Sequence, residues 1–300
     1  MRRPLTAAQV AQAFHDACLA ELDALKPGNV HRVGDDARIE DACVEDACVD
    51  PRMTVADFEE SARVSAPAIA GIGLSVGMRI RRAVEATKEA VGQNTNLGII
   101  LLGGPLAAAA LDDAAGNLRK RLGRVLAALS VEDARDAYAA IRAAEPGGLA
   151  EVPQHDIASE PNVTLLEAMR IAEGYDRIAW NYTHDYADIF DLGLPRLEAA
   201  MERWQSLPFA TSFVYLGFLA TIPDTLIERK FGNHHGAQVM QEAGWLETRF
   251  AESSSPQALV PNLTAFDHSL KARGLNPGTS ADLTVATLFA ASLQALEERR

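Results

Sequence analysis

The amino-acid sequence predicts an all-α protein, and three observations support that prediction. Apolar side chains recur at four-residue spacing near both ends of the chain, at Val10, Phe14, Cys18 and Leu22 and again at Val285, Phe289 and Leu293. Runs of alternating β-branched residues, which are typical of strands, are nearly absent. Hydrophobic residues make up 48% of the 300-residue chain, which is enough to build a sizeable core.

The helical pattern is expected in the segments 5–24, 54–86, 164–174, 185–205, 209–220, 235–252 and 279–297. Thr6 and Thr54 stand where the N-caps of the first two segments are expected. Pro67 is expected to kink or split the second segment. The best strand candidate is Leu97 to Leu102, a short apolar run that fits buried helix equally well. Loops are expected around 26–53, 92–96, 146–163 and 254–263.

The length of 300 residues suits one large domain or two intimate lobes, and we expect a single helical domain over residues 1–300. The charge limits its partners. The formal net charge is −13, and such a surface repels DNA and anionic membranes. We therefore expect no nucleic-acid partner, and an anionic ligand has to bind in a local basic pocket. The uncharged run at 206–223 is predicted to be a buried core helix, since it is barely long enough to cross a membrane and carries polar residues. The apolar helices fit a homodimer interface as well as a core.

The cysteines indicate a reducing compartment, and we expect a cytoplasmic location. Three cysteines are too few for a disulfide framework, and no apolar signal segment follows Met1. Two of them, Cys43 and Cys48, lie in a tandem Glu-Asp-Ala-Cys-Val repeat at 40–49. An exposed acidic loop is favoured there over a metal site, because the spacing of the thiols is not the usual zinc spacing and no histidine pair lies nearby.

The first segment suited to chemistry is Lys26-Pro27-Gly28-Asn29-Val30-His31-Arg32, directly after the first predicted helix. Pro and Gly fix a turn, and Lys26, His31 and Arg32 then supply three donors on an otherwise acidic protein. Converging cations on a rigid backbone suit a phosphate group. A helix C-cap at Gly28 flanked by ordinary surface cations explains the same residues equally well.

The second segment is Gly92-Gln93-Asn94-Thr95-Asn96-Leu97-Gly98, which precedes a wholly apolar stretch. Buried amides need hydrogen-bond partners, so this cluster predicts either a polar network or a bound ligand. Helix capping by Asn94 or Thr95 is the simpler alternative, although capping requires only one such residue.

Two further segments combine a turn with the start of a helix. Asp224 is expected to cap a short helix that carries Thr225 and Arg229. Asn276-Pro277-Gly278 is expected to form a tight turn before the final helix, whose first residues include Ser280 and Asp282. The amide donors of such a terminus attract phosphate, but a plain capped helix has the same pattern.

A weaker candidate is the pair His184 and Asp188. If a helix begins near Thr183, these two side chains share a face, as a metal site or a proton relay requires. An ordinary surface pair is the favoured interpretation. The chain has no Gly-Lys dipeptide, and therefore no P-loop, and no nucleophile elbow or His-Glu-x-x-His motif.

Taken in order, these segments resemble the triphosphoribosyl-dephospho-CoA synthase family. Lys26 to Arg32 resembles its early Lys-Pro-Gly motif, and Asn94 to Gly98 its central Asn-Thr-x-x-Gly motif. Asp224-Thr225 with Arg229 resembles a later segment, and 276–282 resembles the Pro-Gly-x-Ser-Ala-Asp motif before the last helix. The citrate-lyase members typically carry His-Lys where this chain has Asn96-Leu97, so the chain is more similar to a divergent subgroup associated with archaea and methylotrophs.

The resemblance implies an all-helical fold with a central polar pocket and a reaction in which ATP and 3′-dephospho-CoA yield triphosphoribosyl-dephospho-CoA and adenine. By analogy with glycoside chemistry this reaction requires two acidic side chains, and we assign Asp224 and Asp282 to them or to Mg²⁺ on the triphosphate. Nucleotide and phosphate binding is expected from Lys26, Gly28, Asn29, His31, Arg32, Asn94, Thr95, Asn96, Gly98, Thr225, Arg229 and Ser280. Two alternatives stay open: an ATP-using step in tetrahydromethanopterin or methanofuran synthesis, and a nucleotide-binding subunit without catalysis.

Overall fold

The computed structural model describes residues 4–33, 53–145 and 159–299. All regular elements in these ranges are helices, which confirms the predicted fold class. Cys43 and Cys48, with the repeat around them, lie outside the described residues, as do residues 146–158 of the predicted loop at 146–163.

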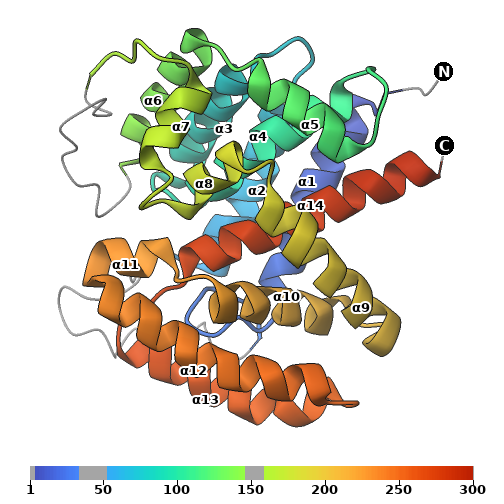
Figure 1. The fold of residues 1–300 in the computed structure, drawn as a ribbon, viewed down its shortest axis with the longest axis vertical. Coiled ribbons are helices and arrows are strands. Elements are labelled where there is room, and N and C mark those ends of the chain that lie inside the picture. The colour runs from blue at the N-terminus through green and yellow to red at the C-terminus, as the bar shows by residue number, and fades with distance from the viewer. Residues whose placement is uncertain (1–3, 34–52, 146–158, 300) are drawn as a thin grey trace. The chain divides into compact units, whose positions relative to one another are not determined.

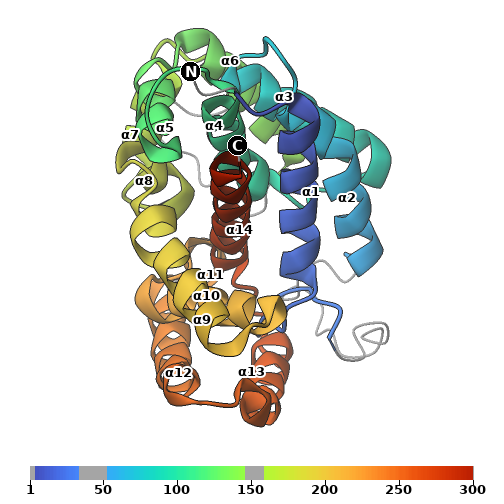
Figure 2. The same cartoon turned by 90° about the vertical axis from the view of Figure 1, so that its right-hand side faces the viewer.

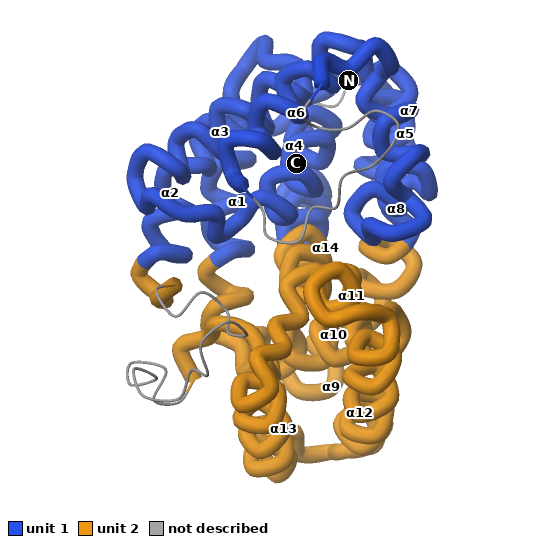
Figure 3. The backbone as a smooth tube through the Cα atoms, turned by 90° about the vertical axis from the view of Figure 1, so that its left-hand side faces the viewer, with its two compact units in different colours: residues 1–18, 57–187, 289–300 blue, residues 19–56, 188–288 orange. Residues whose placement is uncertain are grey.

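The chain forms two compact units, which Figure 3 colours separately. Unit 1 comprises residues 1–18, 57–187 and 289–300, and unit 2 comprises residues 19–56 and 188–288. Helices α1 (Ala7–Leu22), α2 (Val55–Ile69) and α14 (Gly278–Glu298) contribute residues to both units. That the chain forms one domain stays a prediction, and each unit is described by itself.

The remaining helices divide between the units (Figure 1). Unit 1 contains α3 (Val76–Val91), α4 (Leu97–Leu111), α5 (Leu118–Ala127), α6 (Val131–Ala144), α7 (Leu165–Ala172) and α8 (Arg177–Thr183). Unit 2 contains a π-helix (Asp188–Gly193), α9 (Leu194–Trp204), α10 (Leu207–Thr221), α11 (Thr225–Phe231), α12 (Asn233–Glu252), a 3-10 turn (Pro256–Leu259) and α13 (Val260–Ala272).

The predicted starts of the first two helices are confirmed, but the predicted break in the second segment is misplaced. The backbone N–H of Gln9 donates to Thr6 Oγ1 and the Gln9 side chain accepts from the Thr6 N–H, which is a capping box. α2 continues through Pro67 to Ile69, and the chain leaves the helix only at 70–75. Gly73 lies in this stretch with φ +73°, a left-handed conformation that ends a helix at little cost for glycine.

Leu97 to Leu102 forms the first half of α4 and not a strand. The helix is buried almost all round, which explains why its apolar run lacks helical periodicity. Pro105 lies inside α4, and a proline has no N–H to give to the carbonyl four residues earlier. The hydroxyl of Tyr182 in α8 donates to that carbonyl, Leu101 O, over 2.7 Å. Tyr186 donates to the next one, Leu102 O, over 3.2 Å. Two buried tyrosines therefore satisfy the carbonyls beside the proline.

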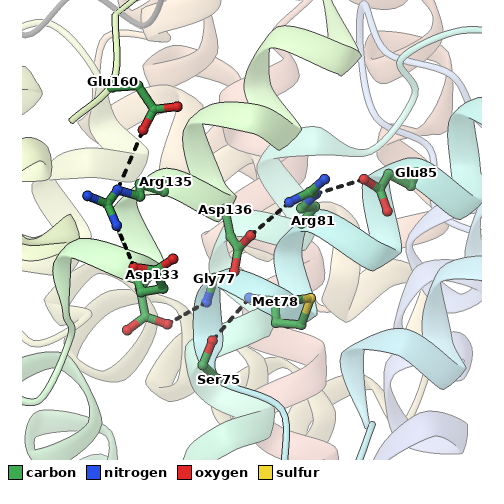
Figure 4. Close-up of polar contacts among 10 residues, drawn as sticks. Ser75, Gly77, Met78, Arg81, Glu85, Asp133, Arg135, Asp136 and Glu160 are labelled. Atoms are coloured by element: carbon green, nitrogen blue, oxygen red, sulfur yellow. Dashed lines mark hydrogen bonds and ion pairs between the residues drawn. The ribbon is translucent and has the colours of Figure 1, made fainter.

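α3 and α6 pack closely in unit 1 because Gly77 lacks a side chain. A Cβ at Gly77 would lie 2.5 Å from the Cα of Asp133. Asp133 in turn caps its own helix with Ser130 and accepts a 2.8 Å hydrogen bond from the Gly77 N–H. Figure 4 shows this carboxylate at the start of α3, with Arg81 placed between Asp136 and Glu85 nearby. Gly77 is therefore a helix-packing residue.

Unit 2 is built around α10, which packs against α9 and α12 (Figure 2). One core cluster joins α10 to α11, α12, α13 and α14 through Tyr215, Leu219, Ile227, Val239, Ala243, Leu270, Leu275 and Ala281. The uncharged run at 206–223 thus lies largely in the core, as predicted. Among the described residues no single helix is long and apolar enough to cross a membrane, although α10 and α11 together pass that test as a pair bent by 51°.

Candidate functional site

The Lys26–Arg32 segment forms a buried turn in unit 2. The Asn29 N–H closes the turn on Lys26 O over 3.0 Å. Gly28 has φ +81°, and a Cβ there would lie 2.8 Å from Leu275 O and 2.9 Å from Leu270. Its N–H donates to Asp267 Oδ1 over 2.8 Å. Only glycine fits this position, both for its conformation and for the space around it.

Lys26 is fully buried and forms an ion pair with Glu21, the penultimate residue of α1. Its Nζ also donates to Asn29 Oδ1 over 3.2 Å. Burial raises the pKa of the Glu21 carboxyl, and the nearby ammonium only partly opposes that effect. The lysine charge predicted to serve a phosphate is therefore already shared with a protein carboxylate.

The other polar side chains of the turn point to different partners. Asn29 donates through Nδ2 to Asn276 Oδ1 over 2.8 Å. His31 Nδ1 lies 3.0 Å from Asn29 O, and because a carbonyl only accepts, Nδ1 carries the proton. Its Nε2 lies 4.0 Å from Asp267 Oδ2. Arg32 is exposed and forms an ion pair with Asp23.

Asp224 connects the N-termini of α11 and α14. Its Oδ1 accepts from the N–H groups of Leu226 and Ile227, at 3.1 and 3.3 Å, which confirms the predicted cap. Its Oδ2 accepts from the N–H and the hydroxyl of Ser280, both at 2.8 Å. Burial raises the pKa of Asp224 despite these donors. With two donors on each oxygen, this carboxylate occupies the anion position at the start of α14.

Hydroxyl groups complete the connection between the two helices. Thr225 Oγ1 lies 3.1 Å from Thr279 Oγ1, and the latter also accepts from the Leu226 N–H over 3.2 Å. Since Asn276 holds the Lys26 turn and Ser280 holds Asp224, the segment 276–280 joins both clusters. Three of the four segments singled out in the sequence therefore meet in unit 2.

Asp282 and Arg229 lie on the two connected helices. Asp282 is half-buried in the first turns of α14, and Arg229 is half-buried near the end of α11. The described residues contain no group of three or more His, Cys, Asp or Glu side chains arranged to hold a metal. Mg²⁺ needs no such group, because it usually binds one or two carboxylates together with substrate phosphates. Asp282 fits that role better than Asp224, whose lone pairs are already used.

Sequence reasoning missed three residues of this site: Glu21, Tyr215 and Asp267. Tyr215 is fully buried and donates to Pro27 O over 2.7 Å. Burial raises its pKa far above the ordinary value, and the charges of Asp224, Asp267 and Glu21 act in the same direction. All three lie on helices whose pattern indicates only core or surface. The one sequence signal that could have found Glu21 and Asp267 is a carboxylate at a position of a helix where an apolar residue is expected.

The Asn94–Gly98 segment belongs to unit 1 and forms a polar network with α2. Gln93 donates to Asp57, and Thr95 Oγ1 lies 2.5 Å from Ser61 Oγ. The buried Asn96 donates from Nδ2 to Ser65 Oγ over 3.4 Å. Asn94 Oδ1 accepts from the N–H of Leu97, the first residue of α4, but the N-cap residue is Asn96, whose side chain makes no cap hydrogen bond. The predicted polar network is therefore present, and ligand binding by this segment stays a prediction.

The weaker candidate, His184 with Asp188, required a helix to begin near Thr183, and a helix ends there instead. α8 ends at Thr183, and Asp185 and Tyr186 then have φ values of +48° and +53°. A π-helix begins only at Asp188. His184 instead stacks on Trp180, with ring centroids 4.0 Å apart. The reversal of the chain between the two residues removes the four-residue helical spacing on which the pair depended.

The chain is similar to known proteins in sequence and in fold. The family model of the ATP:dephospho-CoA triphosphoribosyl transferases matches residues 7–300. A crystal structure of a protein assigned as a triphosphoribosyl-dephospho-CoA synthase from Archaeoglobus fulgidus is similar in fold, with a TM-score of 0.60 and 23% identity. The match covers 78% of this chain and 97% of that one. A search of curated proteins finds no match. Since the family model covers nearly the whole sequence, the chain belongs to the ATP:dephospho-CoA triphosphoribosyl transferase family, a family of transferase enzymes.

Proposed function

We propose that this protein transfers the triphosphoribosyl group of ATP to 3′-dephospho-CoA and releases adenine. The observation that carries the proposal is the meeting of the Lys26, Asp224 and Asn276–Ser280 segments in unit 2, through the Asn29–Asn276 and Asp224–Ser280 hydrogen bonds. Residues far apart in sequence are thereby fixed around one segment, as a shared binding function requires. The reaction takes place in the cytoplasm in this proposal.

The chemistry is a substitution at the anomeric carbon of the ATP ribose. A hydroxyl oxygen of the acceptor forms a bond to that carbon while the bond to adenine breaks. The hydroxyl proton goes to a base, adenine leaves with the bonding electrons, and it takes up one proton. Positive charge develops at the anomeric carbon, so a carboxylate near it lowers the barrier.

We assign different roles to the two predicted carboxylates. Asp282 is the candidate for stabilising that charge or for holding Mg²⁺ with the triphosphate, which would neutralise phosphate charge when bound. Asp224 is a positioning residue in this proposal, because its four hydrogen bonds hold α11 and α14 together. A direct role for Asp224 would require it to give up one of them. Thr225 and Ser280 support the same connection.

Cations and amides are assigned to the substrate phosphates and the ribose. His31, Arg32 and Arg229 are the candidates for phosphate contacts, with Lys26 and Asn29 holding the turn that carries the first two. Gly28 allows the turn itself to close against Leu275 and Leu270. In unit 1, Asn94, Thr95, Asn96 and Gly98 stay candidates for nucleotide binding.

The test is to incubate the protein with ATP, Mg²⁺ and dephospho-CoA and to separate the products by chromatography. Free adenine in equal amount to consumed ATP supports the proposal. ADP, AMP or phosphate would instead favour another ATP-using step, such as one in pterin or furan cofactor synthesis. Binding of ATP without any product would favour a non-catalytic nucleotide-binding subunit.

Asp282→Ala is expected to reduce adenine release about a hundred- to a thousandfold, as the loss of one transition-state contact does in other enzymes. Glu252→Ala, which removes an exposed carboxylate from α12 of the same unit, is the matched control. Circular dichroism of both variants establishes that the helices persist. Normal turnover of the Asp282 variant would remove this residue from the mechanism.

A further inference from the structure

Arg79 is a buried arginine in unit 1 that the proposed function does not use. It lies in the first turns of α3 and is only 4% exposed. Its Nη1 donates to Ile69 O, the last residue of α2, over 2.7 Å. Burial lowers the pKa of this guanidinium. A cation at a helix C-terminus is favourable, but the guanidinium has five N–H donors and the Ile69 carbonyl accepts from only one of them.

The side of the guanidinium formed by Nε and Nη2 has no partner among the described residues. Nε is buried without a hydrogen bond, and the Nη1 bond is the single polar contact of this side chain. Those two nitrogens present parallel donors that match two oxygens of one carboxylate or phosphate. The bond from Nη1 fixes the orientation of the guanidinium. It leaves the parallel N–H donors of Nε and Nη2, here called the Nε–Nη2 fork, without an acceptor in the described part of the chain.

No carboxylate of the described residues pairs with Arg79, which is costly for a buried charge. Arg121, in the same unit, shows the alternative. It is equally buried, but it donates to the carbonyls of Ala109 and Gly116 and pairs with Glu297. The unit can thus satisfy a buried arginine with its own groups, and at Arg79 it does not.

The neighbourhood of Arg79 connects it to the Asn94–Gly98 segment. Ser61, Ser65 and Ile69 follow at four-residue spacing and so share one face of α2. Ser61 contacts Thr95, Ser65 accepts from Asn96, and Ile69 accepts from Arg79. Four residues of helix span about 6 Å, so Ser65 and Ile69, which accept from Asn96 and Arg79, lie about one turn apart along α2.

We propose that Arg79 binds a phosphate group through its Nε–Nη2 fork, beside the amides of the Asn94–Gly98 segment. The choice of phosphate rests on the proposed function, because the substrates named for this family, ATP and dephospho-CoA, offer phosphates and no carboxylate. The phosphate belongs either to the triphosphate of ATP or to the diphosphate of dephospho-CoA, and both present the required pair of oxygens.

The test compares Arg79→Lys with the wild type by calorimetric titration with ATP, inorganic tripolyphosphate and dephospho-CoA. Lysine keeps the charge and a donor for Ile69 O but lacks the fork. At least one of the ligands is expected to bind tenfold or more weakly, which corresponds to about 1.4 kcal/mol. Weaker binding of ATP and tripolyphosphate would assign the site to the triphosphate, and weaker binding of dephospho-CoA alone would assign it to the diphosphate.

Arg121→Lys is the matched control, since it changes a buried arginine whose partners all belong to the protein. It is expected to lower the melting temperature and to leave all three affinities unchanged. Unchanged affinities in Arg79→Lys, or an equal loss in Arg121→Lys, would overturn the proposal.

Arg79→Met separates a ligand site from a purely structural cap. Methionine removes an uncompensated buried charge, so the ligand-free variant is expected to melt no lower than Arg79→Lys, while binding falls further. A lower melting temperature with wild-type affinities would contradict the proposal. A wild type that binds these phosphates through Arg79 but releases no adenine would refute the proposed reaction and leave this site intact.

Discussion

Gly28 combines two constraints that are usually found apart, a left-handed backbone and a filled space above Cα. Gly73 has nearly the same φ, +73°, but nothing within 4 Å of an added Cβ. Alanine substitutions at the two glycines therefore separate the free-energy cost of a left-handed φ from the cost of a steric clash.

Gly73→Ala is expected to lower the free energy of unfolding by about 1 kcal/mol through the left-handed φ alone. Gly28→Ala is expected to cost about 2–4 kcal/mol, because a methyl group also meets Leu275 O and Leu270. Urea unfolding of both variants measures the difference. Equal losses would show that the Lys26 turn shifts easily, and would weaken its assignment as a rigid part of the site.

Asp224→Asn tests the connection between α11 and α14. An asparagine accepts through one atom only, so its NH₂ group would face the donors of either Ser280 or the start of α11. We expect a loss of about 1–3 kcal/mol for buried groups left unsatisfied. Hydrogen exchange should speed up at the first amides of both helices.

Ser280→Ala removes only the hydroxyl bond and keeps the N–H bond to Asp224, so a smaller effect is expected. If Asp224→Asn exchanged like the wild type at both helix starts, the positioning role would be wrong.

Asp133 gives a pH-dependent contribution to the stability of unit 1. Burial raises the pKa of this carboxyl, but hydrogen bonds from Gly77, Ser130 and Ser75 outweigh burial, and the pKa is lowered. Because the pKa is lower in the folded state, the charged carboxylate stabilises the protein at pH values above the unfolded-state pKa of about 3.9. This stabilisation is lost as the pH falls through the folded-state pKa.

Asp133→Asn is therefore expected to melt several degrees below the wild type at pH 7, with the gap narrowing below about pH 4. Glu85→Gln changes an exposed carboxylate shown in the same view (Figure 4) and should shift the melting temperature little. A constant gap from pH 7 to pH 3 would contradict the role given to the Asp133 charge.

At the level of elements, α4 depends on a neighbouring helix for its hydrogen bonding. Tyr182→Phe leaves Leu101 O without its donor and is expected to cost about 1–3 kcal/mol. In a Pro105→Ala background the new N–H can bond Leu101 O, so the same change should cost less. A double-mutant cycle in urea measures this coupling, and additive effects would mean that the tyrosine does not replace the bond lost at the proline.

The sequence predicts helices well where one face is apolar and poorly where burial or small residues hide the pattern. The helices at both ends of the chain, α12 and the uncharged α10 lie close to their predicted bounds. The helices α5, α6, α8 and α13 were missed: α6 is rich in alanine, and α13 follows a proline-containing 3-10 turn. α2 passes Pro67 and ends at Ile69, two residues later, an end that periodicity does not reveal.

The site was predicted in part, for a physical reason. Turn residues such as Gly28, Asn29, Asp224 and Ser280 are visible because caps and tight turns need particular residue types. Their partners on helices, such as Asp267 and Glu21, are not visible, since a carboxylate on a helix is usually at the surface. Sequence therefore identifies the loops of the site but not the groups that hold them.

For the molecule as a whole, the charge of −13 opposes the approach of anionic substrates. Screening by salt should reduce that opposition, so kcat/KM for ATP is expected to rise a few-fold between 10 and 150 mM salt at fixed free Mg²⁺. Steady-state adenine release measures it, with the melting temperature at each salt concentration as the control for stability. A steep fall would instead indicate that local cations dominate the encounter.

The division of the chain among the units has a consequence for synthesis on the ribosome. Unit 1 is assembled from three separate stretches, and its last stretch, 289–300, supplies Phe289 against Phe14 and Glu297 against Arg121. During synthesis, Arg121 therefore lacks its carboxylate partner until Glu297 has been added. Unit 1 cannot complete the contacts of its core before residues 289–297 have left the ribosome.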